Sequence, residues 1–355
     1  MTTDLTDMVQ SGRLMIGPWY VLPDLFLVSG ESIIRNLQVG RMIAQKFGAP
    51  MPVGYMPDQF GFNSQIPQLL AGFGLGDAVV WRGFDDTLPT ELWWEAPDGS
   101  RLLIHRLEGK YGYLNAAHLK FGSPEEFARQ TREIIDRMRP EIGSGHYLLM
   151  AGVDHRFPNR DLPAAVRDIG SAFGDTDVCQ STLPAYFEGV RARIDDAPVV
   201  RGEQRRSEKM EMLLGTLSTR MYLKQENERA ETLLGYVAEP LCAFARLCGA
   251  DYPHALLHYA WKELLKNHAH DSICGCSTDE VHREMLTRFA ASRQIGQMLS
   301  EFACKHLADG LSKSSDSDKT RCVLVFNTLP WQRTELLDVE MRLPKDENWR
   351  DLAIY

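Results

Sequence analysis

The 355 residues are 44% hydrophobic and 25% charged, which is enough apolar material for a large core and more than one domain. The formal net charge is −9 and no run of Lys or Arg occurs, so the chain lacks the positive field that nucleic acid binding needs. No stretch approaches the roughly 18 apolar residues of a membrane span, and the first residues carry neither a basic leader nor an apolar signal core. The sequence argues against nucleic acid or membrane as a partner and predicts a cytoplasmic protein.

Up to about residue 182, short apolar runs alternate with amphipathic segments, which is typical of β-α units around a parallel sheet. In chain order we expect a helix at 32–47, a strand at 53–56, a helix opening at Ser64 and Pro67, strands at 78–81 and 102–105, a helix capped by Ser123, and strands at 147–150 and 177–180. The sequence therefore predicts an α/β fold for this region.

Beyond residue 183 long helical patterns cover 212–247 and 254–311. The polar run SKSSDSDK then marks a linker, and strand-like alternation follows at 322–326 and 335–341. The expected domains are an α/β catalytic domain at 1–185, a helical domain at 186–311, a linker at 312–320 and the start of a β domain at 321–355.

Two aspartates stand at equivalent places in the β-α pattern. Asp58 follows the strand expected at 53–56, and Asp154 follows the one expected at 147–150. Because loops at the C-terminal ends of parallel strands form the active face, the two carboxylates are expected to converge. Paired carboxylates are the groups that hydrolyse glycosides, one as nucleophile and one as acid/base. The alternative is that each aspartate only caps the next helix.

A histidine-rich cluster, NHAHDS at 267–272, lies in the helical region. Two histidines and an acid within one turn, followed by Gly275, indicate a helix-end site for a metal or an anionic transition state. Histidines two apart do not share a helix face, so only one is expected to reach Asp58. Cys274 and Cys276 lack the second ligand pair of a Cys/His zinc site and are interpreted as structural.

Seven runs of the chain resemble segments of glycoside hydrolase family 38, in the family's order. They are GPWYVLPDLFLVSGESIIRN, VGYMPDQFGFNSQIPQLL, WRGFDD, MAGVDHRF, STRMYLKQENERAETLL, NHAHDSICGCSTDEVHREM and FNTLPWQR. Together they extend over essentially the whole chain, and the bacterial branch that acts on mannosyl glycosides, including 2-O-mannosylglycerate, is the most similar. The resemblance implies a seven-stranded β/α barrel-like domain, then a three-helix bundle, then β domains.

The resemblance also implies roles for the two aspartates. Asp58 matches the aspartate of the family's Asp-x-Phe-Gly segment, which implies that it is the nucleophile and a zinc ligand. Asp154 matches the acid/base position. As a retaining pair, their carboxyl groups are expected to lie roughly 5 to 6 Å apart on one face of the α/β domain.

Four further residues take roles from the resemblance. His270 matches the zinc-binding histidine and is expected to reach from the helical region toward Asp58, and Asp271 matches a carboxylate that holds sugar hydroxyls. Phe60 is expected to stack on the sugar, and Arg82 is expected to orient the carboxylates.

The chain departs from the family pattern at its start. Family members begin with a strand that carries His-x-Asp, whose two residues complete the site of one Zn²⁺ ion, and no such motif precedes Trp19. The resemblance therefore implies that the catalytic domain lacks its first strand and that two expected ligands are absent from this chain. Leu25 also stands where the family has an acid.

The sequence thus predicts a retaining glycosidase that cleaves terminal α-mannosides, with a mannoside or a mannosylglycerate-like substrate. One alternative is a catalytically inactive fragment with an incomplete metal site, and zinc content separates these two interpretations. A second alternative, a carbohydrate deacetylase on a related barrel, needs its own metal-ligand set, which the sequence does not show. A homo-oligomer stays open.

Overall fold

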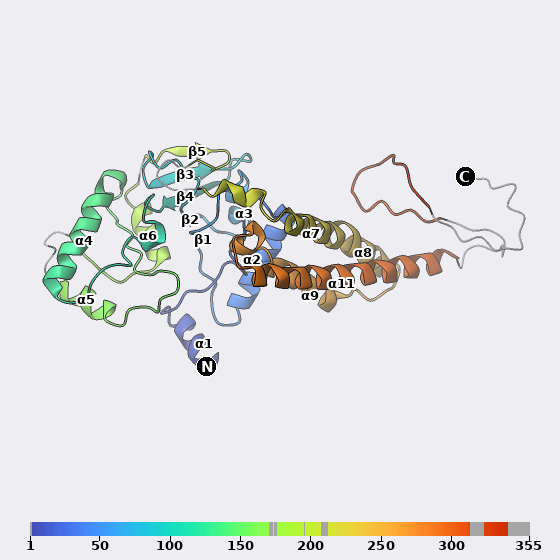
Figure 1. Ribbon diagram of the computed structural model, residues 1–355, viewed down its shortest axis with the longest axis horizontal. Coiled ribbons are helices and arrows are strands. Elements are labelled where there is room, and N and C mark those ends of the chain that lie inside the picture. The colour runs from blue at the N-terminus through green and yellow to red at the C-terminus, as the bar shows by residue number, and fades with distance from the viewer. Residues whose placement is uncertain are drawn as a thin grey trace, which may run out of the picture.

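The computed structural model describes residues 2–169, 173, 176–194, 196–206, 212–312 and 323–339. The molecule is elongated, with a sheet and its helices at one end and a group of long helices at the other (Figure 1). None of the helices within these ranges is long and apolar enough to cross a membrane.

One sheet of five strands organises the first part of the chain, in the order β1-β2-β4-β3-β5. The strands are β1 (Gly54–Met56), β2 (Asp77–Val80), β3 (Glu91–Glu95), β4 (Arg101–Arg106) and β5 (Val199–Arg201). All pairs are parallel except β3 with β4, which form a hairpin. In place of the expected seven-stranded barrel, the described residues form a mixed, mostly parallel five-stranded sheet.

Three of the five expected strands are confirmed as β1, β2 and β4, whereas 147–150 and 177–180 form no strand. The segment 148–150 is instead held by the side chain of Asn115, whose Nδ2 donates to the Leu148 oxygen at 2.9 Å while the Met150 nitrogen donates to Asn115 Oδ1 at 2.7 Å. A side-chain amide thus takes the place of a neighbouring strand.

Strand β5 corrects the expectation that 186–311 is helical throughout. Val199 pairs with Trp93 of β3, so the chain returns to the sheet before the long helices begin. The pairing continues in register with Trp94 opposite Val200 and Glu95 opposite Arg201.

Helices cover the sheet and extend beyond it. They are α1 (Thr2–Gln10), α2 (Gly30–Ala44), α3 (Ile66–Gly72), α4 (Pro124–Met138), α5 (Leu162–Ile169) and α6 (Leu183–Arg191), with 3₁₀ turns η1 (Gly112–Leu114) and η2 (Arg139–Glu141). The expected cap of α4 is confirmed, because the Glu126 nitrogen donates to Ser123 Oγ at 3.2 Å. The expected start of α3 at Ser64 is wrong: its N-cap is Gln65, which makes no side-chain cap bond, and Pro67 lies in its first turn.

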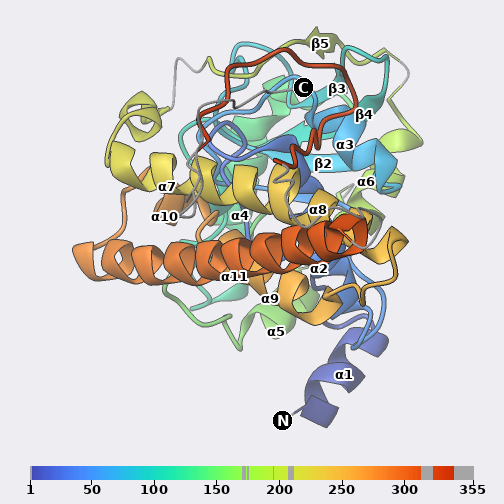
Figure 2. The same ribbon diagram turned by 90° about the vertical axis from the view of Figure 1, so that its right-hand side faces the viewer.

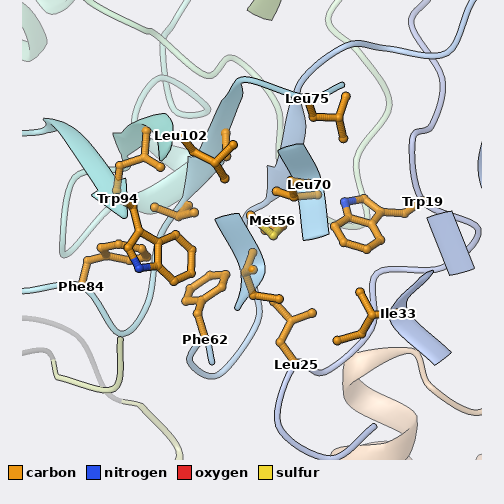
Figure 3. Close-up of a cluster of buried hydrophobic side chains, with 14 of the residues drawn as sticks. Trp19, Leu25, Ile33, Met56, Phe62, Leu70, Leu75, Phe84, Trp94 and Leu102 are labelled. Atoms are coloured by element: carbon orange, nitrogen blue, oxygen red, sulfur yellow. The ribbon is translucent and has the colours of Figure 1, made fainter. Parts of the chain in front are cut away.

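A hydrophobic core fills the space between the sheet and the helices α2 and α3 (Figure 3). Phe62 and Phe84 follow β1 and β2, and both make edge contacts with Trp94 of β3, at centroid distances of 5.8 and 5.2 Å. Leu25, at the position where the resemblance suggested an acid, is buried in this core. Each fully buried side chain of this size contributes roughly 1.5–3 kcal/mol, so the loops after β1 and β2 are anchored beside the residues of the site.

The second part of the described chain is helical apart from its connections, as expected at 212–247 and 254–311. Its elements are η3 (Leu214–Leu217), α7 (Met221–Thr232), a π-helical segment η4 (Leu233–Ala238), α8 (Glu239–Leu247), α9 (His254–Lys266), α10 (His270–Cys274) and α11 (Asp279–Ser312). The long helix α11 packs along α7, η4, α8 and α9 (Figure 2).

The linker expected at 312–320 lies outside the described residues except for its first residue. Residues 323–339 are described and contain no strand, so the strands expected at 322–326 and 335–341 are wrong over that range. Their remaining positions, and 340–355, lie outside the described residues.

Candidate active site

The carboxyl ends of two neighbouring parallel strands bring Asp58 and Arg82 together. Asp58 follows β1, Arg82 follows β2, and these strands pair in register. Arg82 donates to Asp58 Oδ1 from Nε at 3.0 Å and from Nη2 at 2.8 Å. The Arg82 guanidinium also lies over the Trp81 ring, 4.4 Å from its centroid. The expectation that Arg82 contacts a carboxylate of the site therefore agrees with its position, and the contact fixes one oxygen of Asp58.

Two glycines near these residues allow a third segment to pass close by. Gln204 forms an isolated antiparallel bridge with Phe62, and the Arg206 nitrogen donates to the Gly83 oxygen at 2.8 Å. Gly61 and Gly83 have φ values of +116° and +88°, which L-residues rarely adopt. The segment around Gln204 thereby holds the loops that carry Asp58 and Arg82.

Replacing Gly83 by Ala is expected to lower the free energy of unfolding by more than strain at its positive φ alone would. A Cβ atom at Gly83 would lie 2.4 Å from the carbonyl oxygen of Gln204, whereas Gly99 has the same φ of +88° and nothing within 4 Å. We expect Gly99→Ala to cost about 1–2 kcal/mol from its left-handed backbone and Gly83→Ala about 1–3 kcal/mol more from overpacking. Urea unfolding of both variants measures the difference, and equal losses would contradict this account of the Gln204 segment.

Tyr113 joins Asp58 to Asp154. Its hydroxyl lies 3.3 Å from Asp58 Oδ2 and 2.8 Å from Asp154 Oδ2. The two carboxylate oxygens are therefore no further apart than these two distances added together. Asp58 and Asp154 thus lie on one side of the α/β part, both within reach of one hydroxyl.

Helix α10 carries His270 to this place. The Leu22 carbonyl accepts hydrogen bonds from the His270 nitrogen at 2.9 Å and lies 3.2 Å from its Nδ1. The other ring nitrogen, Nε2, faces Asp58 Oδ2 at 3.6 Å. His268, the other histidine, is fully buried and bonds to Asn227 through Nε2 at 2.6 Å.

The C-terminal end of α10 is held by buried groups. The Cys274 thiol donates to Asp24 Oδ2 at 3.2 Å, and Lys224 Nζ donates to the Ile273 oxygen at 2.8 Å. Burial, together with the Asp24 charge, raises the pKa of Cys274, so this thiol stays protonated. Its contacts agree with the structural interpretation of Cys274.

Phe60 and Asp271 are both close to His270. Phe60 is 5% exposed and packs edge-on against the His270 ring, with centroids 6.0 Å apart. The Asp271 side chain is 61% exposed, and its Oδ1 lies 3.8 Å from His270 Nε2. Asp271 Oδ1 also accepts a hydrogen bond from the thiol of Cys276 at 3.3 Å. The sugar contacts expected of Phe60 and Asp271 stay predictions.

The charges of the site favour an ionised Asp58. Burial alone would raise the pKa of the Asp58 carboxyl, but the neighbouring His270 and the hydrogen bonds and charge of Arg82 hold that pKa below its ordinary value. For His270, burial would lower the pKa, and Asp58, Asp271 and the Leu22 carbonyl together raise it. Burial and the charges of both aspartates raise the pKa of Tyr55 to about 12, which keeps its hydroxyl neutral.

Asp58 and His270 offer two donor atoms of the kinds that zinc binds. Two atoms bound to one zinc ion at about 2.1 Å lie at most about 4.2 Å apart, and the 3.6 Å between Asp58 Oδ2 and His270 Nε2 satisfies this limit. The carbonyl of Leu22 beside Nδ1 is the partner that a metal-binding histidine commonly has. In the part of the chain that the structure describes, no third His, Cys, Asp or Glu side chain joins them as a metal group. The pair fits zinc as two of about four ligands.

Sequence reasoning did not assign two residues that shape this site. No local pattern distinguishes Tyr113 from the other aromatic residues of the chain. Gln204 reaches the site because β5 returns the chain to the sheet, and this three-residue strand has no clear periodicity. The signal that could have found Gln204 is the pair of glycines after Asp58 and Arg82, which indicates a close backbone approach.

Two family models match most of this chain. Residues 1–203 match the family model of the glycosyl hydrolases family 38 N-terminal domain, and residues 211–307 match the α-mannosidase middle domain. Since the first match alone spans more than half of the chain, the chain belongs to glycosyl hydrolase family 38.

Several relatives are much longer than this chain. A Halalkalibacterium halodurans protein provisionally named mannosylglycerate hydrolase is 34% identical over 90% of the chain and 37% of its own length. Human alpha-mannosidase 2C1 is 28% identical over 96% of the chain and 31% of its own length. The crystal structure of an α-mannosidase from Enterococcus faecalis V583 superposes with a TM-score of 0.82 at 36% identity, covering 86% of this chain and 35% of that one. The chain spans about a third of the length of these relatives.

Proposed function

We propose that this chain carries the catalytic groups of a retaining α-mannosidase, acting on mannosides or mannosylglycerate-like glycosides. The observation that supports this most directly is the convergence of Asp58 and Asp154 on one Tyr113 hydroxyl, since glycoside hydrolysis uses two carboxyl groups that flank the reacting bond. The names of the relatives support mannose as the sugar.

In the proposed reaction Asp58 attacks the anomeric carbon while Asp154 gives its proton to the departing glycosidic oxygen. The bond from the anomeric carbon to that oxygen breaks as the bond to the Asp58 oxygen forms. Water then adds to the anomeric carbon, Asp154 takes one of its protons, and Asp58 leaves as a carboxylate, so that mannose is released with retention. Arg82 supports this role of Asp58 by occupying its Oδ1 and favouring its charge.

We further propose that Asp58 and His270 hold a zinc ion together with ligands in addition to these two. Zinc, when bound, supplies a template and a Lewis acid for sugar oxygens. The resemblance to the family's metal site and the 3.6 Å separation of the two donor atoms support this proposal.

The incomplete donor set favours a second candidate, a protein without turnover. Two protein ligands hold zinc weakly, since structural and catalytic sites use three or four. Metal analysis of the purified protein separates the candidates: about one zinc per chain that is lost in His270→Ala supports the metal-dependent enzyme. Substoichiometric zinc that is unaffected by His270→Ala supports the alternative. Lys266→Ala, nearby on α9, serves as the control.

The stereochemical course of hydrolysis tests the proposed function. We expect the protein to hydrolyse 4-nitrophenyl α-mannoside and the first mannose released to be the α anomer, because two successive displacements at the anomeric carbon restore its configuration. Proton NMR during the first minutes distinguishes the anomers before mutarotation. Early β-mannose would contradict a retaining mechanism, and no hydrolysis would contradict the activity itself.

A further inference from the structure

Tyr113 is the residue that contacts both carboxylates. Its hydroxyl carries one proton, yet it lies within hydrogen-bonding distance of Asp58 Oδ2 and Asp154 Oδ2. A hydroxyl can donate to only one of them and must accept from the other, or leave that contact without a proton. The Tyr113 hydroxyl therefore donates to one carboxyl group at a time, and which one depends on which of the two is charged.

The ring of Tyr113 is firmly placed. It packs edge-on against Trp81 with centroids 5.3 Å apart, and Trp81 Nε1 donates to the Gly109 oxygen at 2.9 Å. Gly112, the residue before Tyr113, has a φ of +51°, and a Cβ there would lie 2.3 Å from the Trp81 indole. The 3₁₀ turn η1 can approach Trp81 only because residue 112 is a glycine. This close approach helps to fix the position of the Tyr113 hydroxyl.

The polar surroundings of the hydroxyl come from several elements. Asp58 and Tyr55 belong to β1 and its loop, Arg82 approaches from the loop after β2, His270 from α10 and Asp154 from the loop after 147–150. Arg82 occupies Asp58 Oδ1, so Tyr113 is left facing Oδ2 together with His270. Asp154, by contrast, is exposed to solvent and accepts a hydrogen bond from Tyr113.

We infer that Tyr113 is a positioning residue that holds Asp154 at the reach of a retaining pair and donates its proton to a different carboxylate in each half of the reaction. This inference rests on the proposed function and goes beyond it. An exposed aspartate on a loop has many rotamers, and a 1 Å displacement of an acid/base group is enough to slow proton transfer. A hydroxyl fixed by Trp81 selects the rotamer that faces Asp58.

The change of partner follows from the bonds that form and break. Before attack, Asp58 is the anion, so Tyr113 donates to Asp58 and accepts from protonated Asp154. When the anomeric carbon binds Asp58, that oxygen becomes part of an ester, and the Asp154 proton has moved to the departing oxygen. Rotation of the same hydroxyl then directs its proton to the Asp154 carboxylate, which takes a proton from water in the second half. No proton is lost or gained by Tyr113.

Tyr113→Phe tests the inference, because it removes the hydroxyl and keeps the ring contact with Trp81. The matched control is Tyr111→Phe in the same turn, since the Tyr111 ring lies under Arg137 and away from the carboxylates. Both variants are compared with the wild type on methyl α-mannoside and on 2,4-dinitrophenyl α-mannoside. The first has a poor leaving group that needs an acid, and the second has a good one that does not. Melting temperatures check that each variant is folded.

We expect Tyr113→Phe to lower kcat/KM on the methyl glycoside by roughly 10- to 100-fold, the lower part of the range for general acid catalysis. On the dinitrophenyl glycoside we expect a smaller loss in kcat/KM and a fall in kcat, because breakdown of the intermediate then limits turnover. The inhibition constant of mannose should stay within about twofold, since the hydroxyl faces the carboxylates. Tyr111→Phe should match the wild type.

Three results would overturn the inference. Tyr113→Phe could match the wild type on both substrates, or it could lose equally on both, or it could raise KM and the mannose constant with kcat unchanged, which would make Tyr113 a sugar-binding residue. In each of these cases an active wild type leaves the proposed function standing. A folded wild type without activity on either substrate would contradict the proposed function and this inference together.

Discussion

Asp58→Asn is expected to lower kcat/KM on aryl α-mannosides by on the order of 10⁴-fold or more, because it removes the atom that bonds to the anomeric carbon. The amide has the same shape as the carboxylate and still accepts from Arg82, so the fold should be kept. Steady-state kinetics with a good and a poor leaving group measures the loss, which should be large for both. Asp136→Asn, on the exposed face of α4 and paired with Arg139, is the matched control.

A variant Asp58→Asn that keeps a tenth or more of the wild-type rate would contradict the assignment of Asp58 as nucleophile. A large loss of kcat/KM together with a large drop in the unfolding midpoint would also count against this role, because unfolding would then explain the loss. We expect the unfolding midpoint to change little, since the Asp58 side chain is 22% exposed and its partner Arg82 keeps the Trp81 contact.

Asp154→Ala is expected to show a loss that depends on the leaving group. On methyl α-mannoside kcat/KM should fall about 10²- to 10⁴-fold, because the departing oxygen no longer receives a proton. On 2,4-dinitrophenyl α-mannoside kcat/KM should fall much less, while kcat should fall because Asp154 also activates water in the second half. Kinetics on a series of aryl mannosides measures this as a steeper dependence of the rate on the leaving-group pKa.

Asp161→Asn, at the end of the same loop, is the control for Asp154→Ala and should match the wild type. A loss in Asp154→Ala that is equal for all leaving groups would contradict the acid/base role. Another carboxylate near Asp58, with Asp271 the first to examine, would then have to supply the proton.

The sequence predicted the parts of the site that depend on local patterns. The apolar runs indicated the strands that precede Asp58 and Arg82, while the role of Arg82 came from the family resemblance. The runs at 147–150 and 53–56 have similar composition, yet only the second is a strand. The difference is a hydrogen-bonding partner, the Asn115 side chain, which is 33 residues from Leu148 and leaves no trace in the local pattern.

His270 shows where local reasoning needed the resemblance. Its approach to Asp58 depends on the bridge between Pro23 and Ala269 and on the Leu22 carbonyl, which is 248 residues from His270 in the chain. Spacing within NHAHDS shows that the two histidines face different directions but not which one faces the site. Tyr113 and Gln204 are likewise positioned by contacts with residues distant in the sequence. Tyr113 packs against Trp81, and Gln204 lies against the loops that contain Gly61 and Gly83.

The proposed mechanism depends on a covalent bond between Asp58 and the sugar. The most direct measurement is to incubate the protein with 5-fluoro-α-mannosyl fluoride, which slows breakdown of the intermediate, and to locate the label by mass spectrometry of tryptic peptides. The account predicts a fluoromannosyl group on the peptide 47–82, at Asp58, and none on Asp58→Asn. A label on Asp154, on Asp271 or on any other residue, or a wild-type protein that takes up no label, would contradict it.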